Sequence, residues 1–394
     1  MASQVVHPEP VRQRLARIQR TALIVGGAGL LLAVVGALLN SSQLFRSYLF
    51  AYLFWLGITL GCLAWLLVQH VAGGRWGMLL RPLLEASALL VGLMAILFVP
   101  LLLGLDSLYV WTHPDVMSHD VMLMHKQPYL NVPFFIGRAV LYFIVWGSSI
   151  LLLVRWARVQ DPARRAVMAD RLRRFSGPAL ALYGLCITFA AFDWIMSLEP
   201  HWYSTIFGVL VAAGQVVTGL SFAIVVLVYL AQMEPLAQVV SRPLLMDLGN
   251  LLLAAVLFWS YIAFMQFFII WSANIPEEVV WYLHRLEGGW EWVAIALVIF
   301  HFVAPFALLL SGQNKRNPRR LATVALLLLA AQLLHLFWMV APVYAEGRFR
   351  LHWLDLALLL LIGGVWVAAF VWMLGRRPLL QAAELEALEV RAHE

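Results

Sequence analysis

The chain has 394 residues, of which 63% are hydrophobic and 12% charged, and its formal net charge is +6. Soluble domains carry about 25% charged residues, so this chain has too little polar surface to cover soluble cores of its size. The excess of positive charge does not indicate nucleic-acid binding, because it is confined to segments between apolar runs.

Apolar runs of about 20 residues, the length that crosses a bilayer as a helix, occur ten times along the chain. Helices are required because an isolated strand would leave its backbone groups unpaired in hydrocarbon. The fold class is therefore predicted as all-α and integral to the membrane. The predicted spans are 21–39, 47–69, 84–105, 134–154, 177–198, 207–231, 247–271, 290–311, 321–341 and 354–374.

The two ends of the chain differ from this ten-helix domain, which is predicted over 21–374. Residues 1–20 form a basic tail, and the first apolar run is too long for a signal peptide. Residues 375–394 place leucines among glutamates, which is typical either of an amphipathic surface helix or of a polar tail.

The distribution of Lys and Arg predicts the orientation. The tails and alternate loops on one side carry 21 of these residues, and the loops on the other side carry five. This asymmetry places both termini in the cytoplasm, and the expected location is a bacterial inner membrane. The basic loop 155–176 is expected to hold a surface helix.

The predicted outer side has two long loops, 106–133 and 272–289, but no soluble domain. Aromatic residues at its edges are typical of an interfacial belt, and they include Trp111, Trp202, Tyr203, Trp281, Tyr282, Trp290 and Trp353. Chemistry in water is therefore expected to come from partner proteins.

The two cysteines, Cys62 and Cys186, both lie in apolar runs, and no C-x-x-C or C-x-x-C-H motif is present. These features predict buried thiols. They exclude covalently attached haem and the usual iron–sulfur or zinc frameworks within this chain. The sequence therefore predicts no metal site.

Ionisable residues inside spans are costly, so each is a functional candidate. Asp193 lies roughly 7–9 Å below the outer edge of the fifth span, and Arg138 enters the fourth span from the same side. Two interpretations are compatible here: a structural ion pair, and a proton or quinol role.

His301 and His335 lie within the eighth and ninth spans, and Pro305 follows His301 by four residues. A proline at that position frees the carbonyl of His301. The two histidines differ in predicted depth by roughly 7 Å, which disfavours a haem held between them. An interhelical hydrogen bond is the simpler interpretation of each.

Further polar residues suggest inner and outer halves of a proton path, with helix–helix hydrogen bonding as the alternative. They are Glu85, Asp247, Gln215 and Glu291.

Two strings, FAAFDWIMSLEPHWYSTIFG at 189–208 and WSANIPEEVVWYLHR at 271–285, carry a family resemblance. Together with the ten-span layout, they make the chain resemble the membrane subunits of bacterial alternative complex III, a quinol:electron-acceptor oxidoreductase. Those subunits are of the polysulfide-reductase membrane-anchor type. Such a complex contains two related large membrane subunits. In its length and short inner N-terminus, this chain resembles the second of them, called quinone-binding subunit 2.

The resemblance implies two four-helix bundles, spans 2–5 and 6–9, flanked by spans 1 and 10. It implies that this chain binds no metal, supports assembly and provides proton half-channels, with quinol as its possible ligand. The implied partners are a sister ten-helix subunit, an iron–sulfur subunit, multihaem and monohaem cytochrome c subunits, and lipids. Haem c and iron–sulfur clusters would then belong to partners, and no nucleic acid is expected.

Carried onto this sequence, the resemblance draws attention to Glu199 and His201 in the first string and to Glu277, Glu278 and Arg285 in the second. The quinol-site candidates are Asp193, Arg138, Glu199 and His201. The turn around Glu199 and His201 has an architectural alternative. Two further functions stay open: a quinol-binding subunit with its own site, and a stand-alone transporter. Pro100 and Pro305 are not the matched helix breaks that transporters often show.

Overall fold

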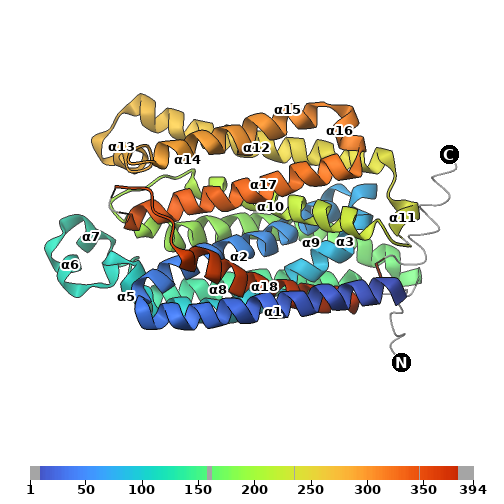
Figure 1. Cartoon of the computed structure of the whole chain (residues 1–394), viewed down its shortest axis with the longest axis horizontal. Coiled ribbons are helices and arrows are strands. Elements are labelled where there is room, and N and C mark those ends of the chain that lie inside the picture. Colours follow the sequence, from blue (N-terminus) through green and yellow to red (C-terminus); the bar gives the residue numbers. More distant parts are fainter. Residues whose placement is uncertain (1–8, 158–161, 235, 346, 380–394) are drawn as a thin grey trace.

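The computed structural model describes residues 9–157, 162–234, 236–345 and 347–379, and every regular element among them is helical. Within these residues, ten helical segments are long and apolar enough to cross a membrane. The prediction of an all-α integral membrane protein is confirmed. The start of α1 and the end of α18 lie at one end of the bundle, here called the terminal end (Figure 1). The opposite end, with α6, α7 and α13, is called the loop end.

The long helices match the predicted spans in order and number, and most of them extend beyond the apolar runs. They are α1 (Glu9–Leu39), α2 (Ser41–Ala72), α3 (Arg75–Ala88) with α4 (Val91–Leu103), α8 (Val132–Ala157), α9 (Pro162–Trp194), α10 (Phe207–Leu230), α12 (Arg242–Ala273), α14 (Trp290–Leu297) with α15 (Ala304–Leu310), α17 (Pro318–Val340) and α18 (Trp353–Gly375). A π-helix, Val298–Val303, joins α14 to α15.

Short elements occupy the connections. They are α5 (Leu105–Leu108), η1 (Val110–Thr112), α6 (Pro114–His119), α7 (Val121–Lys126), η2 (Met196–Leu198), α11 (Leu236–Val239), α13 (Pro276–Leu283), α16 (Gly312–Arg316) and η4 (Ala341–Tyr344). The basic 155–176 segment is mostly the first part of α9 rather than a separate surface helix. Helix α1 begins within the predicted N-terminal tail, and the amphipathic segment predicted after 379 lies outside the described residues.

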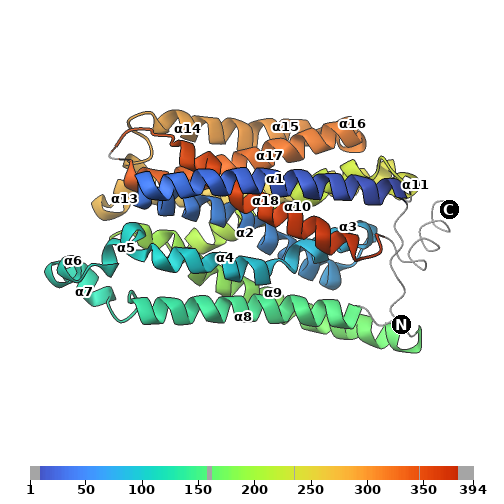
Figure 2. The ribbon, with the colours of Figure 1, turned by 60° about the horizontal axis from the view of Figure 1, so that its bottom comes forward.

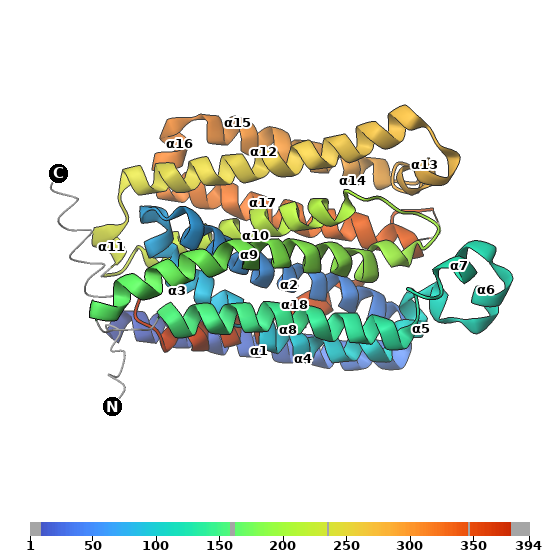
Figure 3. The same ribbon diagram turned by 180° about the vertical axis from the view of Figure 1, so that it is seen from behind.

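Two four-helix groups make up the body of the molecule. The first contains α2, α3 with α4, α8 and α9, and the second contains α10, α12, α14 with α15, and α17. Helices α1 and α18 pack against each other and against α2, and they lie at the opposite edge from α12 and α15 (Figure 1). In the turned view, α1 and α18 run across the front of the bundle, with α8 below them and α15 above them (Figure 2). The view from behind shows α8 and α9 side by side in the first group (Figure 3).

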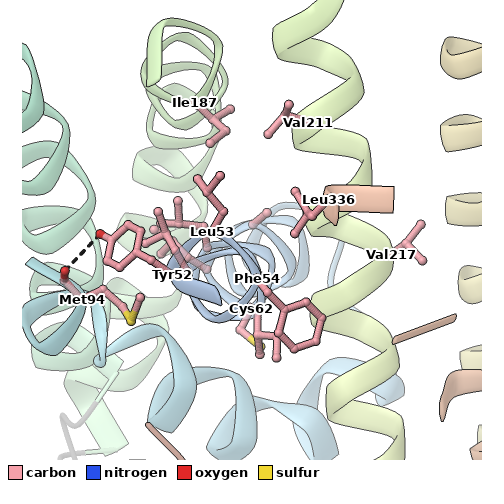
Figure 4. Packing of buried hydrophobic residues seen from close by; sticks show 14 of the residues in the cluster. Tyr52, Leu53, Phe54, Cys62, Met94, Ile187, Val211, Val217 and Leu336 are labelled. Atoms are coloured by element: carbon pink, nitrogen blue, oxygen red, sulfur yellow. Dashed lines mark hydrogen bonds between the residues drawn. The ribbon is translucent and has the colours of Figure 1, made fainter. Parts of the chain in front are cut away.

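The core is centred on α2, which packs against helices of both groups. In the most apolar 18-residue stretch of α2, 89% of the residues are buried inside the protein. Its side chains point outward all round toward neighbouring helices, and Tyr52 donates a 3.0 Å hydrogen bond to the Met94 carbonyl (Figure 4). A helix that is apolar all round is expected at the centre of a membrane bundle.

Close approach of α2 and α10 depends on two glycines. A Cβ on Gly61 would lie 1.9 Å from the Gln215 carbonyl oxygen, and one on Gly219 would lie 2.4 Å from the Gly61 carbonyl carbon. Small residues at such crossings let backbones touch, which is the main source of helix association in lipid. These glycines therefore hold the two helix groups together.

Candidate functional site

The two strings that carry the family resemblance meet at the loop end. Glu199, which follows η2, accepts a 2.6 Å hydrogen bond from Arg285, which follows α13. The indole of Trp202 stacks on Trp281 at 4.8 Å between ring centroids and donates to the Glu278 carbonyl at 3.0 Å. The structure thus brings together residues that are more than 70 positions apart.

Arg285 is the centre of this contact, and its side chain is only 1% exposed. It donates to the carbonyls of Trp281, Trp338 and Met339, and its guanidinium lies 3.8 Å from the Trp281 ring centroid. Burial lowers the pKa of Arg285, and the charge of Glu199 opposes that effect. A buried cation with this many acceptors fixes α13 against α17, which supports the architectural interpretation of Glu199.

His201 and Asp120 form a second contact across the loop end. His201 Nε2 lies 2.5 Å from an Asp120 carboxylate oxygen, and Asp120 also accepts from the backbone N–H groups of Met122 and Leu123 at the start of α7. The hydrogen bond to His201, followed by that to Leu123, lowers the pKa of Asp120. Lys126 donates to the Pro200 carbonyl at 2.5 Å. His201 therefore ties the turn after η2 to the 106–133 loop.

Asp193 and Arg138 form the ion pair that the sequence left as one interpretation. Two guanidinium nitrogens of Arg138 lie 2.9 and 2.8 Å from the two carboxylate oxygens of Asp193, whose side chain is fully buried. Tyr142 donates to the same carboxylate at 2.7 Å, and Arg138 also donates to the Tyr129 carbonyl. A bidentate pair with these added bonds satisfies both charges, which supports the interpretation as a structural ion pair.

The remaining proton-pathway candidates lie in separate places. Glu85 contacts Arg81 and Arg377 near the terminal end, and Asp247 is exposed at the start of α12. Gln215 accepts a 2.8 Å hydrogen bond from Tyr183 in the core. Glu291 accepts from the backbone N–H of Gly289 at 2.7 Å at the start of α14.

His301 and His335 are neighbours across the second helix group. Their ring centroids are 5.8 Å apart, and Trp259 of α12 lies 3.6 Å from the His301 ring and 5.1 Å from the His335 ring. His301 belongs to the π-helix that ends just before Pro305, and such bulges are frequent at functional sites. Neither ring nitrogen of His301, nor Nδ1 of His335, has a hydrogen-bond partner among the described residues. The hydrogen bonds expected for these histidines are therefore not formed within the described chain.

A groove of about 920 Å³ opens beside this cluster, between α12 and α14. His335, Gln266, Tyr282, Trp338 and Glu291 line it. Its other walls are mainly apolar, many of them exposed on the helix surfaces, and include Leu257, Phe264, Phe267, Ile295, Val298 and Phe302. A large apolar cavity with a few convergent polar groups is the usual form of a ligand site.

The polar groups of the groove lie on both sides of Trp338. The Trp338 ring centroid is 6.3 Å from that of His335 and 6.3 Å from that of Tyr282. Gln266 donates to the Tyr282 hydroxyl at 3.4 Å, and Gln266 Oε1 is buried without a partner among the described residues. His335 and Gln266 both line the groove, and each carries a buried polar atom without a partner among the described residues.

Neither a protein-family model nor a curated protein sequence matches this chain. The ten spanning helices support a multi-pass membrane protein.

Sequence reasoning named His335 and Glu291 but not the groove that joins them. Tyr282 was assigned to an interfacial belt, and Trp259 and Trp338 carried no signal beyond hydrophobicity. The quinol candidates Asp193, Arg138, Glu199 and His201 are divided among three contacts, and none of the four lines this groove. The sequence signal that points to this groove is the mid-span Gln266, which belongs with the predicted half-path residues and is costly in a bilayer.

Proposed function

We propose that this chain is a membrane subunit of a quinol:electron-acceptor oxidoreductase of the alternative complex III type, and that it binds quinol in the groove between α12 and α14. The single observation that carries the proposal is that two buried side chains lining an apolar groove, His335 and Gln266, each keep one polar atom without a partner among the described residues. A quinol has a flat ring with an oxygen at each end and a long apolar tail. The quinol oxygens therefore match the polar side chains of the groove, and the ring and tail match its apolar walls.

The groove also favours quinol over a water-soluble substrate. Transporters need a site that alternates between two aqueous sides, commonly at broken helices in matching positions of two halves. Here the first group is interrupted between α3 and α4, in its second span, whereas the second group is interrupted at the π-helix, in its third span. The two breaks are therefore not in matching positions. Many of the groove's apolar residues are exposed on the helix surfaces, so a lipid-soluble ligand enters without crossing water.

Electron transfer is assigned to partners. The sequence contains no motif for covalent haem or the usual iron–sulfur frameworks, so electrons from the quinol would pass to haem c and iron–sulfur subunits. The loop end, which the contacts of Glu199, Arg285, Trp202 and Trp281 hold in one fixed arrangement, is the proposed attachment site for those partners.

Proton transfer is the second part of the proposed role. Of the predicted pathway residues, His335 and Glu291 line the groove, so protons released from a bound quinol would pass first to these two. His301 adjoins His335 through the shared contact with Trp259. The Asp193–Arg138 pair would remain structural.

Quinol binding is tested by the quinone content of the full-length chain purified in mild detergent and reconstituted with a water-insoluble quinone. Gln266→Leu and His335→Leu each remove a polar side chain that lines the groove, so retained quinone should fall roughly 2–10-fold, the effect of one net hydrogen bond. The matched control is Gln332→Leu. Gln332 is another buried glutamine with an unpaired Oε1, but it packs on Gly214 and does not line the groove.

The control variant should retain the wild-type quinone content. Equal quinone content in all four proteins, each monodisperse by size-exclusion chromatography, would contradict a quinol site in this groove.

A further inference from the structure

A small pocket lies at the loop end, where α2 and α18 begin and η4 follows α17. It has a volume of about 130 Å³ and is lined by Arg46, Arg350, His352, Gln43 and Tyr344, among others. Two long membrane helices start beside it, and the partial positive charge at a helix N-terminus favours an anion. The pocket lies on different helices from the groove, apart from α17, so it is independent of the proposed function.

Among the described residues, Arg46 is held in place without an anionic partner. Its guanidinium lies 4.5 Å from the centroid of the Tyr344 ring, a contact that orients the plane of the group. Its Nε–H is buried and has no hydrogen-bond acceptor among the described residues. A buried, unpaired donor of a charged group is costly, and an anion in the pocket would satisfy it.

One acid, Asp355, also lines the pocket, but its oxygens are already occupied. One accepts from the Ser47 hydroxyl at 2.6 Å and the other from the His352 backbone N–H at 2.9 Å. The His352 ring accepts from the Leu354 N–H through Nδ1. With Arg46 and Arg350 present, the described lining residues carry a net positive charge.

The other cations of this side are engaged elsewhere. Of the five Lys and Arg residues that the sequence places in the loops of the loop end, Lys126 donates to a carbonyl and Arg285 pairs with Glu199. Of the remaining three, Arg46 and Arg350 line this pocket, and Arg348 precedes Arg350 by two residues. Cations are few on the translocated side of membrane proteins, so the presence of two arginines in one small pocket on this side suggests an anionic ligand.

We propose that this pocket binds the phosphate of an anionic phospholipid in the leaflet at the loop end. Leucines that would meet the acyl chains border it: Leu38 and Leu39 end α1 with 84% and 74% of their surface exposed, and Leu351 precedes α18 at 70%. Arginine donates to phosphate through paired N–H groups, and basic pockets between membrane helices hold lipid headgroups. The pocket takes the headgroup and the leucines take the chains.

The test measures lipid binding by the purified full-length chain, with native mass spectrometry after incubation with phosphatidylglycerol or phosphatidylcholine. The wild type should retain phosphatidylglycerol in preference. Each arginine near a charged lipid surface contributes binding worth about fivefold, so Arg46→Gln and Arg350→Gln should each weaken retention about fivefold. Arg348→Gln removes an exposed charge that does not line the pocket, and it should change retention little.

Arg350 is exposed, so its substitution keeps the test valid if Arg46→Gln fails to fold. Equal retention by the wild type and Arg350→Gln would overturn the proposal, as would equal retention of the two lipids. Thermal unfolding with inorganic phosphate alone separates the two possible sources of the anion. A rise in Tm equal to that given by phosphatidylglycerol would replace the lipid with a small soluble anion and so overturn the assignment.

Discussion

Charged side chains within the membrane region of this protein are paired where they are buried most deeply. Asp193 is fully buried, and Arg138, Tyr142 and the Tyr129 carbonyl complete the set of hydrogen bonds around the pair. The histidines and Gln266 differ, since they keep unpaired polar atoms beside an open groove. Completed hydrogen-bond networks stabilise the fold, whereas unpaired buried polar groups are costly. The unpaired atoms of the histidines and Gln266 therefore mark the place where a bound ligand would add hydrogen bonds.

The Asp193–Arg138 pair leads to a prediction about stability. Arg138→Met leaves a buried carboxylate without its cation and should lower the free energy of unfolding by about 3–5 kcal/mol. The double variant Arg138→Met/Asp193→Leu removes both charges and should recover much of that loss. Thermal unfolding of the detergent-solubilised variants measures both effects. A double variant no more stable than Arg138→Met would show that the charges do not act as a pair.

Residue-level prediction from sequence succeeded where chemistry alone decides the outcome. A buried aspartate requires a cation, and Arg138 was the cation at the same predicted edge. The contact between His301 and His335 was not predicted, because it depends on how each helix is rotated about its axis and on the π-helix that turns His301 toward Trp259. The rotation of a helix about its own axis cannot be inferred from the spacing of residues along the sequence.

At the scale of elements, backbone contact between helices organises the protein. Helices α2 and α10 cross at Gly61 and Gly219, and α1 and α18 approach through Gly29, Gly26 and Gly364. The sequence predicted the existence and order of the helices from their apolar runs. It underestimated the lengths of most of them, because these helices continue past the apolar runs with polar residues that composition assigns to loops.

The crossing of α2 and α10 predicts a large effect from one methyl group. Gly219→Ala places a Cβ 2.4 Å from the Gly61 carbonyl carbon, and relieving this clash should cost about 1–3 kcal/mol. Gly184→Ala in α9 is the matched control, because a Cβ there has no neighbour within 4 Å, and alanine favours a helix. Only the first should lower Tm. Equal Tm values for the two variants would mean that the helices do not cross this closely.

The whole molecule has an even number of predicted spans, and the start of α1 and the end of α18 lie at the same end of the bundle. Charge asymmetry predicts that the terminal end faces the cytoplasm. Cysteines introduced by Ser118→Cys at the loop end and Arg319→Cys at the terminal end test this, because both positions are exposed and the native thiols are buried. In intact cells, a membrane-impermeant maleimide should label the first and not the second. The reverse pattern would invert the orientation.

The measurement that tests the central claim most directly is purification through this chain in mild detergent, with mass spectrometry and an absorption spectrum of the product. A quinol:electron-acceptor oxidoreductase subunit should bring with it haem c and iron–sulfur subunits, a sister membrane subunit and a haem c spectrum. A colourless protein without partners would contradict the claim and favour a stand-alone transporter.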